Sequence, residues 1–287
     1  MRRHPDWLKV KIGGGENFAK MKSILRNAKL HTICEEAKCP NIAECFGNGT
    51  SVFLILGDTC TRNCKYCNVK HGNPKSLNYN EPKDVAESVR KLDLRYVVIT
   101  SVTRDDLDDG GALFFYNTIK EVKSLNKKCK LEVLIPDFKG NIESLKKIVS
   151  AKPDVINHNI EVVQELFPDI RPEGNYKISI TVLKNIKEID NNLKSKSGFM
   201  IGLGETKDQI LNTMKDLRKA NVDYLTIGQY LQPSKNHAEI KKYYTPKEFE
   251  ELKNTAINMG FKHVESGPLV RSSYHAEKVF LLSRFIN

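Results

Sequence analysis

The chain has 287 residues, of which 40% are hydrophobic and 28% are charged, as in ordinary soluble proteins with a buried core. No apolar run approaches the roughly 18 residues that a membrane-spanning helix needs, so we expect no membrane insertion. The formal net charge is +11, but the lysines are dispersed and no arginine-rich arm is present, so we expect no nucleic-acid binding.

The first fifty residues hold the first of two cysteine triplets. Cys34, Cys39 and Cys45 are separated by four and then five residues. The arginines that follow Met1 are not followed by an apolar segment, so we expect no secretory signal. Clustered thiols in such a chain indicate a reducing compartment, and we predict a cytoplasmic protein.

The second triplet, Cys60, Cys64 and Cys67, follows the apolar run 52–57 at intervals of three and then two residues. Three thiolates on one loop can hold three irons of a four-iron cluster and leave the fourth iron open to a small-molecule ligand. Structural zinc is the alternative, with His71 as a fourth ligand, although zinc cysteines usually come in pairs. Two triplets within 34–67 predict two metal centres. The isolated Cys129 is expected to be a small packing residue.

Short runs rich in Val and Ile then alternate with helical patterns. Such runs are typical of buried parallel strands, and we expect strands at Val52–Leu56, Tyr96–Thr100, Leu131–Ile135, Val155–Ile160, Ile178–Val182, Phe199–Ile201 and Tyr224–Ile227. Apolar residues at steps of three and four predict helices within 85–92, 115–125, 142–149, 210–217 and 249–257. The alternation predicts βα units and a parallel sheet, but periodicity does not distinguish an open sheet from a barrel.

The spacing Cys60-x3-Cys64-x2-Cys67 is identified as the signature of the radical S-adenosylmethionine superfamily. The first triplet, the segment 104–111 and the run Arg271-Ser-Ser-Tyr274 resemble the lipoyl synthase family, and the resemblance extends over about residues 7–278. It implies an α/β fold with a partial (β/α)6 TIM-like barrel at 51–260. An N-terminal extension at 1–50 would carry the auxiliary-cluster cysteines, and a C-terminal tail at 261–287 would carry an auxiliary-cluster serine.

The resemblance also implies two 4Fe-4S clusters and S-adenosyl-L-methionine. The catalytic cluster would be held by Cys60, Cys64 and Cys67, and the auxiliary cluster by Cys34, Cys39, Cys45 and Ser273, with Ser272 as the alternative. Serine oxygen is a hard ligand for a soft cluster, which suits a bond that must break.

Further residues are predicted to contact the cofactor or the cluster region. They are Tyr66, which lies between two ligands, together with Gly110, Gly111, Asn157, Asn159 and Arg271. Gly110 and Gly111 could equally form a plain turn before a helix. His158, beside the two asparagines, could be a structural histidine.

The implied activity is insertion of two sulfur atoms at carbons 6 and 8 of a protein-bound octanoyl-lysine, which gives the lipoyl group. The implied partners are octanoylated lipoyl carrier domains (2-oxoacid dehydrogenase E2 or glycine cleavage H protein), an electron donor such as ferredoxin or flavodoxin, and an iron-sulfur assembly carrier. The competing hypotheses are a two-cluster electron carrier, a zinc-dependent nucleic-acid binder, and another radical enzyme such as biotin synthase.

Overall fold

Eight strands form one sheet in the computed structural model, which describes residues 5–10, 14–48, 50–274 and 276. Seven neighbouring strands are parallel, and β1 at one edge pairs antiparallel with β2. In spatial order the strands are β1 (His31–Thr32), β2 (Val52–Ile55), β5 (Tyr96–Ser101), β6 (Lys130–Leu134), β7 (Val155–Asn157), β8 (Lys194–Ile201), β9 (Tyr224–Gln229) and β10 (His263–Gly267).

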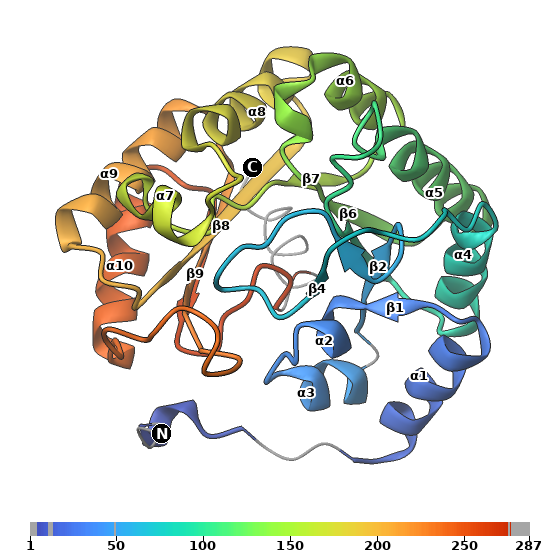
Figure 1. Ribbon diagram of the computed structural model, residues 1–287, viewed down its shortest axis with the longest axis horizontal. Coiled ribbons are helices and arrows are strands. Elements are labelled where there is room, and N and C mark those ends of the chain that lie inside the picture. Colours follow the sequence, from blue (N-terminus) through green and yellow to red (C-terminus); the bar gives the residue numbers. More distant parts are fainter. Residues whose placement is uncertain (1–4, 11–13, 49, 275, 277–287) are drawn as a thin grey trace.

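Helices surround the outer side of this sheet in an arc (Figure 1). The helices that follow the strands are α4 (Glu81–Lys91), α5 (Ala112–Leu125), α6 (Ile142–Ser150), α8 (Tyr176–Ile189), α9 (Lys207–Lys219) and α10 (Pro246–Asn258). Their apolar faces are buried, as Phe115, Ile119 and Val122 of α5 illustrate. In the ranges described, none of the helices is both long and apolar enough to span a membrane.

Six βα units therefore follow one another from β2 to α10, which confirms the predicted partial barrel. The edge strands β1 and β10 do not pair with each other in the described structure, so the barrel stays open. The carboxyl ends of parallel strands lie on the same side of a sheet. The loops that follow β2, β5, β6, β7, β8 and β9 therefore gather at one mouth.

The strand expected at Ile178–Val182 is wrong, because these residues belong to α8. Asn175 caps this helix by accepting a hydrogen bond from Ile178 N at 3.1 Å. The β-branched run imitates a strand, but Val182, Leu183 and Ile186 are buried at helical spacing over the longer segment. The neighbouring strand is β8, which begins at Lys194, well before the predicted Phe199.

The chain before β2 adds small elements that the strand and helix patterns did not predict. They are a 3-10 turn at Asp6–Leu8 and the helices α1 (Glu16–Asn27), α2 (Ile33–Glu36) and α3 (Ile42–Gly47). Figure 1 places α2 and α3 beside the open side of the barrel. At the other end, β10 continues the sheet beyond residue 260. The division into three regions at residues 50 and 260 stays a prediction.

A buried ion pair crosses the barrel strands. Lys196 of β8 and Glu132 of β6 are each 1% exposed, and their charged atoms lie 3.0 Å apart. Glu132 also accepts hydrogen bonds from the Tyr96 hydroxyl at 2.7 Å and from the Asn157 amide at 3.1 Å. A buried charge is tolerated only when it is paired and hydrogen-bonded, so each member of this network needs the others.

The substitution Lys196→Met is expected to lower the free energy of unfolding by about 3–5 kcal/mol, because it leaves the Glu132 carboxylate buried without its cation. Urea unfolding of the metal-free protein measures this change. The matched control is Lys184→Met, which removes an exposed i,i+4 pair with Glu188 and should change stability by less than about 0.5 kcal/mol. Equal effects of the two substitutions would contradict the role given to the buried pair.

Candidate active site

The chain turns sharply where β2 ends, just before the second cysteine triplet. Leu56 has a φ of 69°, in the left-handed region that disfavours a residue with a side chain. The Glu81 carboxyl accepts a hydrogen bond from Leu56 N at 2.8 Å, and Arg104 donates to Leu56 O at 3.2 Å. Burial raises the pKa of Glu81 to about 7. These two side chains hold the strained turn from which the cysteine loop begins.

The cysteine loop has a defined shape within the protein itself. Cys60 ends β3 (Thr59–Cys60), which pairs with β4 (Lys70–His71). The Cys60 sulfur accepts hydrogen bonds from the backbone nitrogens of Arg62 and Thr103, each at an N···S distance of 3.4 Å. Cys67 N donates to Cys64 O at 3.0 Å, which closes a turn over the last two cysteines. These hydrogen bonds fix the shape of the loop that carries the three thiols at the mouth of the barrel.

One cavity of about 510 Å³ receives both cysteine triplets, and we call it the shared cavity. It is lined on one side by the loops of the barrel mouth and on the other by α2, α3 and the chain around them. The cysteines that line it are Cys34, Cys39, Cys45, Cys60, Cys64 and Cys67. Cys129 lies apart from them, buried in the apolar core.

Several thiols of the shared cavity do not readily lose their protons in the absence of metal. Burial raises the pKa of Cys34, Cys45 and Cys67 to about 12, and it raises that of Cys64 as well. Metal-binding cysteines must lose their protons, and bound metal supplies the positive charge that favours this. Two sets of three thiols fit two clusters with three cysteine ligands each. Across the residues described, no three His, Cys, Asp or Glu side chains are gathered as a site for a single metal ion.

A polar wall beyond β7 faces the same cavity. Asn159, Glu161 and Arg171 line it. The Arg171 guanidinium donates to Ile160 O at 3.1 Å, yet its Nε has no protein partner, and neither has Asn159 Oδ1. Buried polar atoms are normally satisfied, so these atoms are available to a polar ligand. His158 also lines the cavity, its Nδ1 lies 2.9 Å from Ile135 O, and burial lowers its pKa to about 4.

The C-terminal segment closes the cavity from the side of β9. Arg271, Ser272 and Ser273 line the cavity beside the first cysteine triplet. The segment is held by the Asn41 amide, which donates to Leu269 O at 2.7 Å, and by the Tyr274 hydroxyl, which donates to the Glu44 carboxylate at 3.1 Å. Residues from both ends of the described chain therefore meet at one site.

The cavity brings together most of the predicted site residues. Those that line it are the six clustered cysteines, Tyr66, Asn159, Arg271 and Ser273. Gly110 and Gly111 are not among the lining residues. They form the turn before α5, where Asp109 accepts hydrogen bonds from Gly111 N and Leu113 N. The plain-turn alternative explains them, so we do not propose a cofactor contact there.

Asn157 is fully buried in the Glu132 network and is also outside the cavity lining. Its amide nitrogen donates to Glu132, whereas its Oδ1 has no protein partner, and its predicted cofactor contact stays a prediction. Asn159, which was predicted with it from the same strand end, lies two positions later and lines the cavity.

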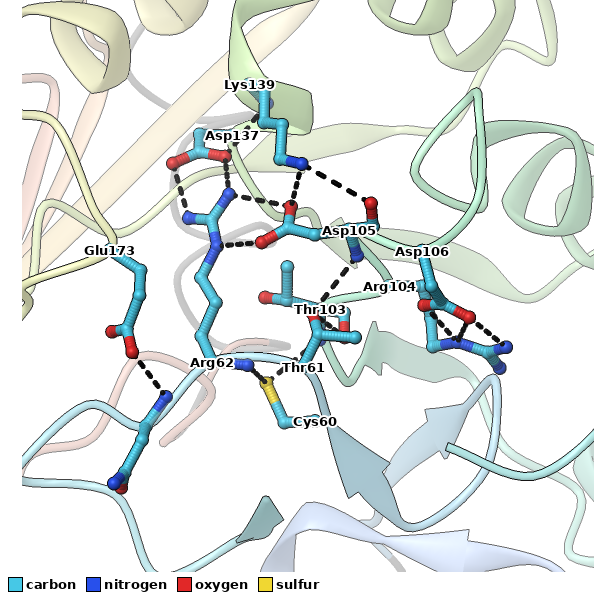
Figure 2. A network of polar contacts seen from close by, with 11 residues as sticks. Cys60, Thr61, Arg62, Thr103, Arg104, Asp105, Asp106, Asp137, Lys139 and Glu173 are labelled. Atoms are coloured by element: carbon cyan, nitrogen blue, oxygen red, sulfur yellow. Dashed lines mark hydrogen bonds and ion pairs between the residues drawn. The ribbon is translucent and has the colours of Figure 1, made fainter. Parts of the chain in front are cut away.

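Two arginines at the site were not singled out from the sequence. Arg171 follows the short helix α7 (Phe167–Ile170), and no motif marks it. Arg62 lies between two cysteines of the second triplet, which was a usable signal. Figure 2 shows its guanidinium between Asp105 and Asp137 at the barrel mouth.

Comparison with protein families gives two matches. Residues 54–217 match the radical SAM superfamily, and residues 1–39 match the N-terminal domain of lipoyl synthase of that family. A lipoyl synthase of Caldicellulosiruptor saccharolyticus is 52% identical over 276 residues, which cover 96% of this chain and 97% of the relative. A lipoyl synthase of Caldicellulosiruptor bescii is 55% identical over 275 residues, which cover 96% of this chain and 94% of the relative.

Solved structures resemble the fold at low sequence identity. Methylornithine synthase has a TM-score of 0.57 at 12% identity, with 95% of this chain and 94% of that chain covered. A maturase of FeFe hydrogenase has a TM-score of 0.58 at 16% identity, with 86% of this chain and 56% of that chain covered. These likenesses support the partial barrel.

The substitution Gly228→Ala is expected to displace the C-terminal segment from the cavity. A Cβ atom at this position of β9 would lie 2.2 Å from the backbone oxygen of Val270, so the backbone must move. Tryptic cleavage after Arg271 in the metal-free protein should then be several-fold faster. Gly47→Ala is the control, since a Cβ there meets no atom within 4 Å. Unchanged cleavage in a folded Gly228→Ala variant would show that Val270 is not seated against β9.

Proposed function

The chain belongs to the lipoyl synthase family of radical S-adenosylmethionine enzymes, and from this premise we propose which residues of the shared cavity carry the reaction. The activity is the insertion of two sulfur atoms, at carbons 6 and 8, into an octanoyl chain held on a carrier protein. Two 4Fe-4S clusters and S-adenosylmethionine, when bound, supply a radical that removes hydrogen from unactivated carbon and the sulfur that replaces it.

In this proposal Cys60, Cys64 and Cys67 hold the catalytic cluster. Two observations support the assignment: the three thiols lie on one loop at the barrel mouth, and the polar wall stands in the same cavity. An amino acid cofactor carries one amino and one carboxylate group. The Arg171 guanidinium is complementary to the carboxylate. Burial raises the pKa of Glu161, and its carboxyl oxygen can accept a hydrogen bond from the amino group, as can Asn159 Oδ1.

Tyr66 is proposed to cover the adenine of the cofactor. It lies between two of the cysteine ligands, it lines the cavity, and burial raises its pKa well above the ordinary value, so it stays neutral. A neutral aromatic ring against a flat base excludes water from the reacting atoms.

The auxiliary cluster is assigned to Cys34, Cys39 and Cys45, with Ser273 as the fourth ligand and Ser272 as the alternative. The support is that both serines line the cavity with this triplet, in a segment held by Asn41 and by Glu44, the neighbour of Cys45. Arg271 is proposed to bind on the same side. It lines the cavity together with Cys39, and burial lowers the pKa of its guanidinium.

The single observation that carries this proposal is the shared cavity. A carbon-centred radical reacts with what lies next to it, so the radical source and the sulfur source must face one space. Both triplets do so here.

The partner proteins are proposed as follows. The octanoyl chain would arrive on an E2 domain of a 2-oxoacid dehydrogenase or on a glycine cleavage H protein, and the net charge of +11 would steer an acidic carrier. Ferredoxin or flavodoxin would supply electrons, and an iron-sulfur carrier would rebuild the auxiliary cluster. We propose the cytoplasm as the compartment, because the thiols must stay reduced.

The variants Cys39→Ala and Cys64→Ala are expected to separate the two roles. Cys39→Ala should retain cleavage of S-adenosylmethionine and lose sulfur insertion, whereas Cys64→Ala should lose both. Liquid chromatography measures 5′-deoxyadenosine, and mass spectrometry of an octanoylated carrier domain measures the inserted sulfur. Cys129→Ala is the control and should retain both. Loss of cleavage in both cluster variants, with both proteins folded, would contradict separate roles for the triplets.

A further inference from the structure

Arg62 makes four hydrogen bonds to two carboxylates, which use four of the five N–H donors of its guanidinium. Its Nε and Nη2 donate to Asp105 at 2.7 and 3.0 Å, and its Nη1 and Nη2 donate to Asp137 at 2.7 Å each. Figure 2 shows the guanidinium lying between the two carboxylates. The Arg62 and Asp137 side chains are 5% and 3% exposed, so this pairing is largely shielded from water.

The three residues belong to three separate loops of the barrel mouth. Arg62 lies between Cys60 and Cys64, Asp105 follows β5, and Asp137 follows β6. Burial raises the pKa of Asp137, but the hydrogen bonds from Arg62 outweigh this effect and lower the pKa to about 2. The carboxylate is therefore charged at neutral pH, and the contact fixes the cysteine loop relative to two strand ends.

A second set of bonds continues this connection to the cluster ligand. Thr61 N donates to Thr103 O at 3.0 Å, and the Thr61 hydroxyl accepts from Asp105 N at 3.0 Å. The segment 103–105 is thereby held alongside the segment 60–62. In this arrangement Thr103 N and Arg62 N both donate to the Cys60 sulfur at 3.4 Å.

Hydrogen bonds to a ligating sulfur stabilise the more negative, reduced state of an iron-sulfur cluster and raise its reduction potential. The residues that hold those N–H groups therefore influence how readily the cluster accepts an electron. Lysine could keep the charge at position 62, but an ammonium group cannot bind two carboxylates in a planar, bidentate way.

We propose that Arg62 is a positioning residue: its double fork to Asp105 and Asp137 holds the Arg62 and Thr103 amides on the Cys60 sulfur and so sets the reduction potential of the catalytic cluster. This role of Arg62 rests on the proposed function, because the Cys60 triplet must hold that cluster. Arg62 does not touch the reacting atoms in this role, and its effect passes through the ligand.

The first test uses the metal-free protein. Arg62→Lys should accelerate hydrogen exchange at the amides of Thr61, Thr103 and Asp105 by about tenfold or more, because the loops are no longer braced. The matched control is Lys187→Met. It breaks a comparably buried pair with Asp223, whose side chains are 8% and 4% exposed, next to the start of β9 and away from the mouth. It should leave exchange at these three amides unchanged.

If Arg62→Lys does not fold, Asp105→Asn replaces it. Asp105 is partly exposed, at 21%, so the substitution weakens one of the two forks at a smaller cost in stability. It should accelerate exchange at the same amides by a smaller factor. Unchanged exchange in a folded variant would overturn the proposal.

The second test measures the cluster itself. In a Cys39→Ala background only the Cys60 triplet should hold a cluster, and a redox titration followed by electron paramagnetic resonance gives its potential. Adding Arg62→Lys should make the potential more negative, and adding Lys187→Met should not. The same potential in all three proteins would overturn the role of Arg62 and leave the proposed function standing. A parent protein that binds no cluster would overturn the proposed function and this inference with it.

Discussion

The site depends on one constraint: six thiols must carry negative charge in a place where water does not reach them well. Burial raises the pKa of Cys34, Cys45 and Cys67 to about 12, so these thiols lose their protons even less readily than exposed cysteines do. A bound cluster removes this conflict, since its irons supply the compensating charge. The burial that opposes charge on the empty thiols also limits the access of water, and exclusion of water protects a radical from side reactions.

The fold meets this constraint by joining segments that are far apart in the sequence. The barrel presents one triplet because Leu56 turns the chain at the end of β2, and Glu81 and Arg104 hold that turn. The N-terminal segment presents the other triplet from the open side of the barrel. The C-terminal segment joins them, held by Asn41 and by the close approach of Val270 to Gly228. The barrel is open where a complete barrel would be closed, and α2 and α3, which carry Cys34 and Cys45 of the first triplet, lie beside this opening.

The sequence predicted much of this arrangement, and the reasons differ between its parts. Cysteine spacing is a local property, so both triplets were identified, and the βα alternation predicted the parallel sheet. The run at 178–182 was misread as a strand because β-branched composition outweighed the helical spacing of Val182 and Ile186. The side chains of Arg171 and Asn159 face the cavity only because α7 and β7 pack as they do. Such tertiary placement leaves no periodic signal, so the sequence does not distinguish Asn159, which lines the cavity, from Asn157, which does not.

The central claim is that the two triplets hold clusters with different tasks at one cavity, one starting the radical chemistry and the other giving up its sulfur. The most direct measurement is a single turnover of protein whose clusters were assembled with isotopically labelled sulfide, in medium without free sulfide. Mass spectrometry of the carrier domain should find the label in both inserted sulfur atoms. Unlabelled sulfur in the lipoyl group would contradict the account.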